Sequence, residues 1–306
     1  MTANTAFSAA YLSLLASGEL EKRVGQAVNG LAACQLCPRS CLVNRLADSP
    51  DGFCRTGRKA ILASFGPHYG EERALVGQHG SGTIFFGHCN LACLFCQNWQ
   101  ISQRGEGHRI SAQRLADIML GLQSMGCHNI NLVSPSHVVA QVLEGLLHAA
   151  QRGLKLPLIY NSGGYDSVQT LRLLDGIIDL YMPDMKFADS LSAAHYLGVD
   201  DYAEINQDAV REMFRQVGHP RKSRSGIVSR GLIIRHLVLP DNLAGTDRLL
   251  HFIAREFGTE TWLNLMDQYR PDYCAPDYPP LDRRLKTYEF RQAYDWAVKL
   301  GLSPLR

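Results

Sequence analysis

Between residues 82 and 266 the chain alternates short apolar runs with longer stretches of helical spacing. The apolar runs predict buried strands at 82–88, 129–134, 156–161, 177–182, 232–239 and 262–266. Apolar residues three and four positions apart predict helices at 111–125, 138–152, 167–176, 190–197, 203–217 and 246–257, with a last helix at 287–300. Alternation of this kind builds a parallel sheet with helices outside it. Six units predict an incomplete (β/α)6 barrel rather than the full eight-stranded barrel.

The pattern differs on either side of this region. Residues 8–33 have helical spacing interrupted at Ser17-Gly18, which predicts two short helices, the second capped by Ser17. Residues 60–65 predict a strand, and the Gly-rich 66–70 predicts the turn of a hairpin that leads into the first barrel strand. The basic stretch 218–230 is expected to be mobile. We expect three parts, which are an N-terminal helical and four-cysteine extension at 1–80, a partial barrel at 81–270 and a C-terminal helical segment at 271–306.

Composition narrows the classes of protein that this chain can belong to. Its 306 residues are 46% hydrophobic and 20% charged, as in ordinary globular proteins. A net charge of +2 argues against nucleic acid as a partner, and no apolar run is long enough for a membrane span. The start of the chain lacks the features of a signal peptide, so we expect a cytoplasmic protein. Clustered cysteines in such a chain more often bind metal than form disulfides, and seven of the nine are clustered.

The first cysteine cluster lies in the N-terminal extension. Its members are Cys34, Cys37, Cys41 and Cys54, separated by Gly, Pro and turn-forming residues. This spacing predicts a second metal site made of four thiolates, which zinc or an iron–sulfur cluster would suit equally. Free thiols in an ordinary loop are the alternative. The basic residues around the cluster could offset thiolate charge or contact an anionic partner, although a solvated basic face is more common; they are Arg39, Arg45, Arg55, Arg58 and Lys59.

The second cluster follows the first barrel strand directly. Cys89, Cys93 and Cys96 are spaced C-x3-C-x2-C, and no further cysteine occurs before Cys127. Three thiolates on one tight loop can hold three corners of a 4Fe–4S cluster, whereas an electron-transfer cluster usually takes four cysteines. One iron is then left open to a chelating ligand. The alternative is three buried or zinc-binding cysteines, although zinc ligands usually come in two separated pairs. Of the two lone cysteines, Cys127 is expected in the core and Cys274 in a surface loop.

Polar residues follow every predicted barrel strand. Because the functional residues of parallel barrels lie at the carboxyl ends of the strands, we expect these segments to form one active-site mouth. After the cysteine loop, the segments are 134–137, 161–166, 183–186, 240–242 and 267–270.

The cysteine loop, with Phe95 before its last cysteine, resembles the signature of the radical S-adenosylmethionine (SAM) superfamily. Over nearly the whole chain, the closest resemblance is to the glycyl-radical activating branch, named after pyruvate formate-lyase activating enzyme, and to an uncharacterised group that carries this label. The resemblance implies an oxidoreductase that binds SAM at the open iron. It implies reductive cleavage of SAM to methionine and a 5′-deoxyadenosyl radical, which abstracts hydrogen from a substrate.

The resemblance also implies site residues. Asn98 matches an Asn two positions after the last cysteine that contacts SAM, and Asp184 and Lys186 match an Asp-x-Lys after strand four. The expected cofactor-binding residues are Phe95, Asn98, Ser134, Asn161, Ser162, Asp184 and Lys186. The chain departs from the family in two places. Ser134, Ser136 and His137 replace a Gly-Gly-Glu stretch that holds the SAM amino group, and His88 replaces a Gly before the first cysteine.

Partners follow from the same resemblance. They are SAM, an electron donor such as flavodoxin or ferredoxin, and a substrate that could be a glycine in a partner protein, another peptide, an RNA or a small molecule. The competing class is a non-enzymatic iron–sulfur or zinc redox module. A ferredoxin needs neither a missing fourth ligand nor polar strand ends, so these features favour the enzyme. A zinc-ribbon nucleic-acid binder is a third possibility, which the near-neutral charge argues against.

Overall fold

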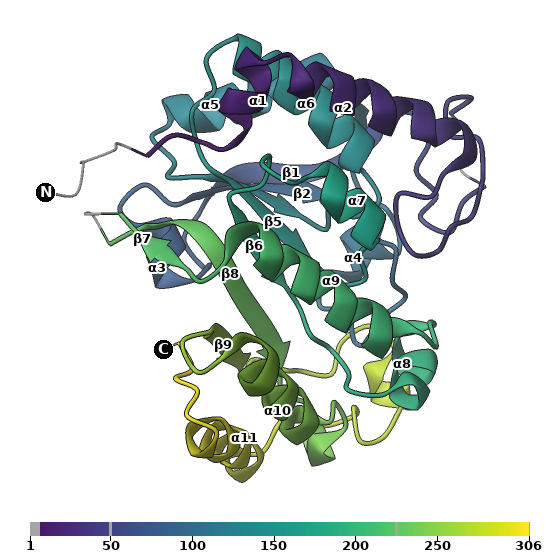
Figure 1. Cartoon of the computed structure of the whole chain (residues 1–306). Coiled ribbons are helices and arrows are strands. Elements are labelled where there is room, and N and C mark those ends of the chain that lie inside the picture. The colour runs from purple at the N-terminus through teal and green to yellow at the C-terminus, as the bar shows by residue number, and fades with distance from the viewer. Residues whose placement is uncertain (1–6, 49–50, 224–225, 306) are drawn as a thin grey trace, which may run out of the picture.

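The computed structural model describes residues 7–48, 51–223 and 226–305. Its core is an open sheet with six parallel strands in the order β2, β4, β5, β6, β8, β9 (Figure 1). Their bounds are Ser81–Phe86, Ile130–Val133, Leu158–Ser162, Leu180–Pro183, Val228–Leu237 and Trp262–Met266. Within the described residues no pairing joins β2 to β9, so the sheet does not close. The predicted incomplete (β/α)6 barrel is therefore confirmed.

Three further strands run antiparallel. β1 (Ala60–His68) pairs with β2 and with β3 (His108–Ile110), so the sheet begins before residue 81. Residues 66–68 were expected in a turn, which is wrong, because their backbone pairs with residues 81–83 of β2 and extends the strand. The short helix α3 (Arg73–Val76) lies in the connection. In the stretch expected to be mobile, β7 (Arg221–Lys222) pairs with the start of β8, while residues 224 and 225 lie outside the described residues.

Helices cover the outside of the sheet at the predicted places. They are α5 (Ala112–Ser124), α6 (Val139–Gln151), α7 (Val168–Leu173), α8 (Ser190–Leu197), α9 (Tyr202–Val217), α10 (Thr246–Phe257) and α11 (Thr287–Lys299). Ser111 caps α5 as its sequence suggests, because its hydroxyl accepts a hydrogen bond from the Arg114 N–H at 3.1 Å. The one-turn helix α4 (Trp99–Ser102) directly follows the cysteine loop.

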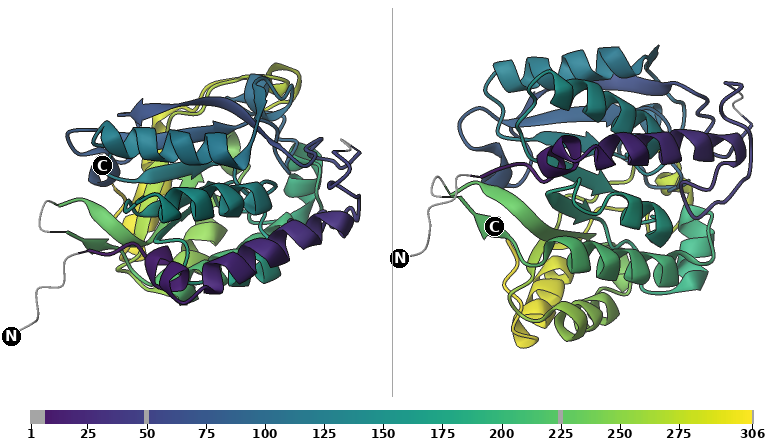
Figure 2. Two further views of the ribbon diagram at one scale, coloured as in Figure 1. Left: turned by 90° about the horizontal axis from the view of Figure 1, so that it is seen from above. Right: turned by 45° about the horizontal axis from the view of Figure 1, so that its top comes forward.

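The N-terminal helices α1 (Tyr11–Ala16) and α2 (Glu19–Asn29) lie across the outside of α6, as both views in Figure 2 show. The predicted cap of the second helix is wrong. The N-cap of α2 is Gly18, in the left-handed conformation at φ 73°, and Ser17 donates its hydroxyl back to the Leu14 carbonyl at 3.1 Å. Two helices that turn within two residues require a backbone conformation that glycine adopts without a steric cost.

The lone cysteines lie where they were expected. Cys127 is 3% exposed and belongs to the main hydrophobic core, and Cys274 is partly exposed in the loop after β9. The Cys274 N–H donates to the Leu94 carbonyl at 2.9 Å, so this loop contacts the cysteine loop after β2. None of the helices in the described ranges is long and apolar enough to cross a membrane.

Candidate active site

One cavity of about 250 Å³ opens at the carboxyl ends of the parallel strands. The structure brings to its wall the three cysteines of the C-x3-C-x2-C loop and all the expected cofactor-binding residues, namely Cys89, Cys93, Cys96, Phe95, Asn98, Ser134, Asn161, Ser162, Asp184 and Lys186. These residues come from four different strand ends and span nearly 100 positions of sequence. Their convergence is a property of the parallel sheet, which places all these ends at one edge.

The cysteine loop is a tight turn stabilised by contacts to its own sulfurs. The Leu91 N–H donates to Cys89 Sγ at 3.5 Å, and Cys96 Sγ shares a hydrogen bond with the Ser102 hydroxyl at 3.0 Å. Burial raises the pKa of Cys89 to about 11 and also raises that of Cys93, whose shift the Lys186 ammonium partly offsets. Cys89 and Cys93 are therefore protonated thiols at neutral pH, and a bound metal must displace their protons.

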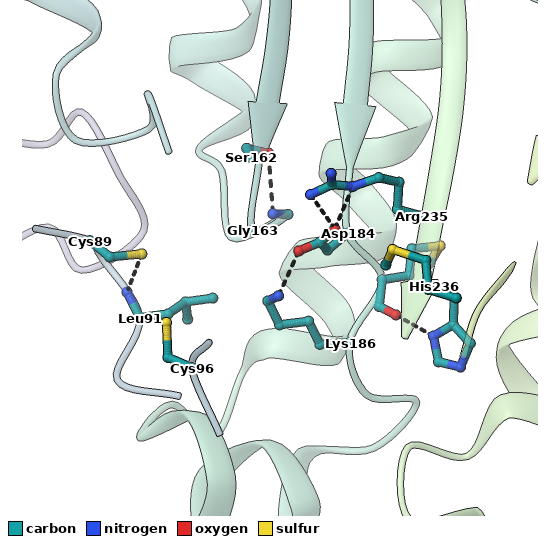
Figure 3. A network of polar contacts seen from close by, with 12 residues as sticks. Cys89, Leu91, Cys96, Ser162, Gly163, Asp184, Lys186, Arg235 and His236 are labelled. Carbon is teal, nitrogen blue, oxygen red and sulfur yellow. Dashed lines mark hydrogen bonds and ion pairs between the residues drawn. The ribbon is translucent and has the colours of Figure 1, made fainter. Parts of the chain in front are cut away.

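Opposite the cysteines lies a network of three charged side chains that are largely buried, with 16–19% of each side chain exposed. Lys186 Nζ donates to Asp184 Oδ2 at 2.6 Å, and Arg235 on β8 donates to Asp184 Oδ1 at 2.9 Å (Figure 3). Burial alone would raise the pKa of Asp184, but Arg235 and Lys186 outweigh it and hold that pKa below its usual range. Burial likewise opposes the charge of Lys186, and the Asp184 carboxylate more than offsets it and raises the Lys186 pKa. Asp184 therefore has a cation on each of its oxygens, while Glu71 and Glu72 also lie close enough to Arg235 to stabilise its charge.

A hydrogen-bond network fixes the end of β5. Ser162 donates to Asp166 Oδ2 at 2.6 Å and accepts from the Gly164 N–H at 3.2 Å, while Tyr160 donates to Asp166 Oδ1 at 2.8 Å. Asn206 on α9 donates to both the Gly164 and the Asp184 carbonyls at 2.9 Å. The ends of β5 and β6 are thus fixed to each other, so residues 161–163 and 184–186 present one rigid wall to the cavity.

Ser134, Ser136 and His137 stand where the resemblance predicted Gly-Gly-Glu, and the structure separates them. Only Ser134 lines the cavity, in a left-handed conformation at φ 57°. His137 is buried, and its Nε2 donates to the Gly87 carbonyl at 3.0 Å; burial lowers its pKa to about 3, so the ring is neutral. Ser136 hydrogen-bonds Asp166 and Tyr160. This stretch therefore offers the cavity a hydroxyl and backbone groups rather than a carboxylate.

Not every polar strand end reaches this cavity. Asp241 and Asn242 after β8 lie in a different hollow, next to α11. Conversely, sequence reasoning did not single out Arg235, Gln97 or Ser102, which all line the cavity. A signal for Arg235 was available, because it is the charged residue inside the apolar run 232–239, where a charge needs a buried partner.

The four N-terminal cysteines form a second group at the same end of the molecule. Burial raises the pKa of Cys37 to about 12; an N–H from Arg39 lowers it, and the thiols of Cys54, Cys34 and Cys41 lie close enough to raise it further. Among residues 7–48, 51–223 and 226–305, no three or more Cys, His, Asp or Glu side chains are closed around a single metal position. This holds for both cysteine groups.

Another hollow, of about 350 Å³, lies between α5, α6 and the start of β1. None of the predicted site residues lines it, so it adds no candidate to the strand-end cavity and the neighbouring four-cysteine group.

The open parallel sheet is similar in fold to a solved radical SAM enzyme. A radical SAM methyltransferase from Sphaerobacter thermophilus superposes with a TM-score of 0.51 at 12% identity, over 73% of this chain and 65% of that one. At this identity the likeness shows the fold alone.

The family is shown by sequence. The chain is 32% identical over 293 residues to the uncharacterized protein MJ0674 of Methanocaldococcus jannaschii, covering 92% of this chain and 79% of that protein. It is 23% identical over 288 residues to MJ0808 of the same organism, also uncharacterized, covering 88% of this chain and 78% of that one. The chain therefore belongs to the family of MJ0674. No family model matches it.

Proposed function

We propose that this protein is a radical SAM oxidoreductase. The observation that carries the proposal is that the thiols of Cys89, Cys93 and Cys96 line the same cavity as the Asp184–Lys186–Arg235 network. Figure 3 shows this network with Cys89 and Cys96 across from it. A 4Fe–4S cluster held by Cys89, Cys93 and Cys96 would supply the electron that cleaves SAM to methionine and a 5′-deoxyadenosyl radical.

The donor set of the cavity fits both groups. Three sulfurs on one turn suit a cluster with one open corner, and Lys186 offers a charge-assisted donor to a carboxylate. Asp184 offers an acceptor for an amine or a ribose hydroxyl. The Ser162 hydroxyl already donates its hydrogen bond to Asp166, so it can only accept a further one, such as a ribose hydroxyl would donate. Phe95 packs edge-on against Phe187 and Tyr269, which makes the wall beside the cysteines apolar.

Within that chemistry, we propose a glycine of a partner protein as the hydrogen donor, and a flavodoxin or ferredoxin as the source of the electron. The first rests on the motif resemblance at Asn98, Asp184 and Lys186, and the second on the need for a one-electron donor.

The test is cleavage of SAM by the full chain. Protein purified anaerobically and reconstituted with iron and sulfide is incubated with SAM and a strong reductant, and 5′-deoxyadenosine is measured. We expect cleavage by the wild type and by Cys127→Ala, whose thiol lies in the core. Cys93→Ala should lose both the cluster signal in electron paramagnetic resonance and cleavage. A fully loaded cluster that yields no 5′-deoxyadenosine would exclude the proposed chemistry.

A further inference from the structure

Arg45 is buried beside the four N-terminal cysteines without a carboxylate to pair with. Its side chain is 1% exposed, its Nη1 donates to Cys34 Sγ at 3.4 Å, and its Nη2 donates to the Gly57 carbonyl at 3.5 Å. Its Nε has no hydrogen-bond partner. No ion pair links Arg45 to an acidic side chain within the described residues. A guanidinium stays protonated even when buried, so this arrangement requires a negative charge from another source.

The source closest to Arg45 is sulfur. A protonated Cys34 would give the guanidinium only a weak, uncharged acceptor. A metal-bound Cys34 is a thiolate. Four thiolates around Zn²⁺, or around an oxidised 4Fe–4S core, leave a net charge of about −2. A buried metal centre with that negative charge would supply the counter-ion that Arg45 lacks, and Arg45 would offset part of the charge of the centre.

The remaining cysteines are placed to join Cys34. The Arg39 N–H hydrogen-bonds Cys37 sulfur, just as the Leu91 N–H hydrogen-bonds Cys89 in the loop after β2. Gly52, close before Cys54, packs so tightly that a Cβ there would lie 3.3 Å from Cys41 Sγ. Arg45 itself connects Cys34 to Gly57, three residues after Cys54. Backbone, glycine and arginine thus hold the two halves of the motif against each other.

The neighbouring basic residues do not share this role. Arg58 makes a two-pronged ion pair with Glu144, and Arg39 donates to the Asn90 and Gly198 carbonyls over the Phe53 ring. Arg55 and Lys59 are exposed. Of the five basic residues around the cluster, Arg45 alone is both buried and directed at a sulfur.

We propose that Cys34, Cys37, Cys41 and Cys54 hold a metal centre separate from the strand-end cavity, and that Arg45 is its buried counter-ion. The two sites share no ligand, so this proposal does not rest on the proposed function. Four sulfurs at about 2.3 Å from one zinc ion lie about 3.8 Å apart, so binding of a single ion would draw these side chains together. An iron–sulfur cluster needs wider spacing, and the experiment distinguishes the two.

The experiment counts metal on the full chain with Cys89, Cys93 and Cys96 all replaced by Ala. The folded protein is offered Zn²⁺ in one arm, and iron with sulfide under anaerobic conditions in the other. We expect about one zinc or about four irons per chain, lost on adding Cys34→Ala or Cys54→Ala and kept on adding Cys127→Ala. Should the triple variant not fold, the same count on wild type against Cys54→Ala gives the difference. The proposal is overturned if the folded protein binds neither metal at this site. It is also overturned if metal binding is unchanged by Cys34→Ala and Cys54→Ala.

The counter-ion role is tested separately with Co²⁺ and a competing chelator, because sulfur-to-cobalt absorption reports the sulfur ligands directly. Arg45→Met should weaken retention of the metal about ten- to a hundredfold, since one charge-assisted contact is lost. Arg45→Lys keeps the positive charge and should retain the metal more tightly than Arg45→Met but less tightly than wild type. If Arg45→Met does not fold, Arg45→Lys is compared with wild type alone. Arg58→Met should retain the metal as wild type does. Equal retention by wild type and the Arg45 variants overturns this role.

Discussion

Lys186 is the residue whose charge matters most to the proposed SAM site. Its ammonium is buried and held by Asp184 at 2.6 Å, so it is positioned before any ligand arrives. Lys186→Ala should weaken SAM binding by about 1.5–3 kcal/mol, or ten- to a hundredfold, with normal cluster content because no thiol is touched. Equilibrium binding of SAM measures this, with the exposed Lys155→Ala as control. Unchanged SAM affinity in Lys186→Ala would leave this pair as a structural ion pair only.

Arg235 adds a second prediction at this scale. Asp184 has one cation on each oxygen, and Arg235→Met removes one of them while keeping a long apolar side chain. The Asp184 carboxylate then keeps Lys186 as its one cation, and one of its oxygens loses a charge-assisted hydrogen bond. The protein should therefore lose about 1–3 kcal/mol of unfolding free energy, as measured in denaturant. Arg152→Met, at an exposed ion pair with Asp117, should cost less than about 1 kcal/mol. Equal losses for the two variants would contradict a buried network.

The cysteine loop and the Asp184–Lys186 pair, which line one cavity, could be singled out from the sequence, because short motifs are recognised by their spacing without knowledge of the fold. Arg235 was missed for a physical reason. It lies some fifty positions from Asp184, and its partner is defined only when β6 and β8 pair in parallel. The same limit applies to Arg45, which reads as one of five surface basic residues until burial separates it from the others.

Among the elements, the turn after β5 depends on one glycine. Gly164 has φ +75°, and a Cβ there would lie 2.1 Å from the Asp184 carbonyl and 2.2 Å from Asn206 Nδ2. Gly164→Ala should cost clearly more than the roughly 1–2 kcal/mol of a left-handed alanine and should also weaken SAM binding, because the ends of β5 and β6 must separate. Gly153→Ala is the control, with φ +95° and open space around its Cβ. Similar unfolding free energies for the two variants would show that the contact with Asp184 is relaxed at little cost.

Asp179, before β6, makes the attachment of the N-terminal helices pH-dependent. Its carboxylate accepts the Ala10 and Leu158 N–H groups at 3.0 Å, but burial dominates and raises its pKa from 3.8 to about 7. The folded chain therefore holds this proton more tightly than the unfolded chain. The contribution of this proton to the free energy of unfolding is full below pH 4 and is lost as the pH rises to about 7. The free energy then falls by up to about 1.4 kcal/mol per pH unit.

Unfolding free energies of wild type and Asp179→Asn between pH 4 and 8 measure this effect. The difference between the two curves should shrink towards neutral pH, because the amide cannot titrate. Parallel curves would mean that Asp179 does not hold a proton in the folded state.

Element prediction succeeded where periodicity is long and failed at the ends of elements. α10 begins and ends at its predicted residues, since its apolar face repeats over three turns. The end of β1 and the cap of α2 were wrong because a strand neighbour and a tight helix–helix turn, both tertiary features, decide them.

In the whole molecule, Arg39 attaches the four-cysteine segment to the loop after β2. It donates to the Asn90 and Gly198 carbonyls at 3.0 and 3.1 Å, and its guanidinium lies 3.6 Å from the centre of the Phe53 ring. Arg39→Met should speed amide exchange in residues 88–96 about tenfold, because the loop loses about 1–2 kcal/mol of support. Lys59→Met removes the same charge from an exposed position and should leave exchange unchanged. Protection of the loop in Arg39→Met equal to wild type would mean that the two cysteine groups are mechanically independent.

The missing pairing between β2 and β9 gives the cavity a compliant side. Among the described residues, separate contacts cross this gap, including Gln97 Nε2 to the Gln268 carbonyl at 3.1 Å, Asn264 to Glu72 at 2.8 Å and the Cys274 N–H to the Leu94 carbonyl at 2.9 Å. A closed barrel could widen only by breaking a ladder of backbone hydrogen bonds, whereas here isolated hydrogen bonds and ring contacts, such as the stacked Trp99 and Tyr273, join the two flanks. The rim is therefore stiff where β5 and β6 are fixed together and yielding across from it. A bulky guest, such as the polypeptide substrate of the proposed function, would enter from this side, opposite the fixed ends of β5 and β6.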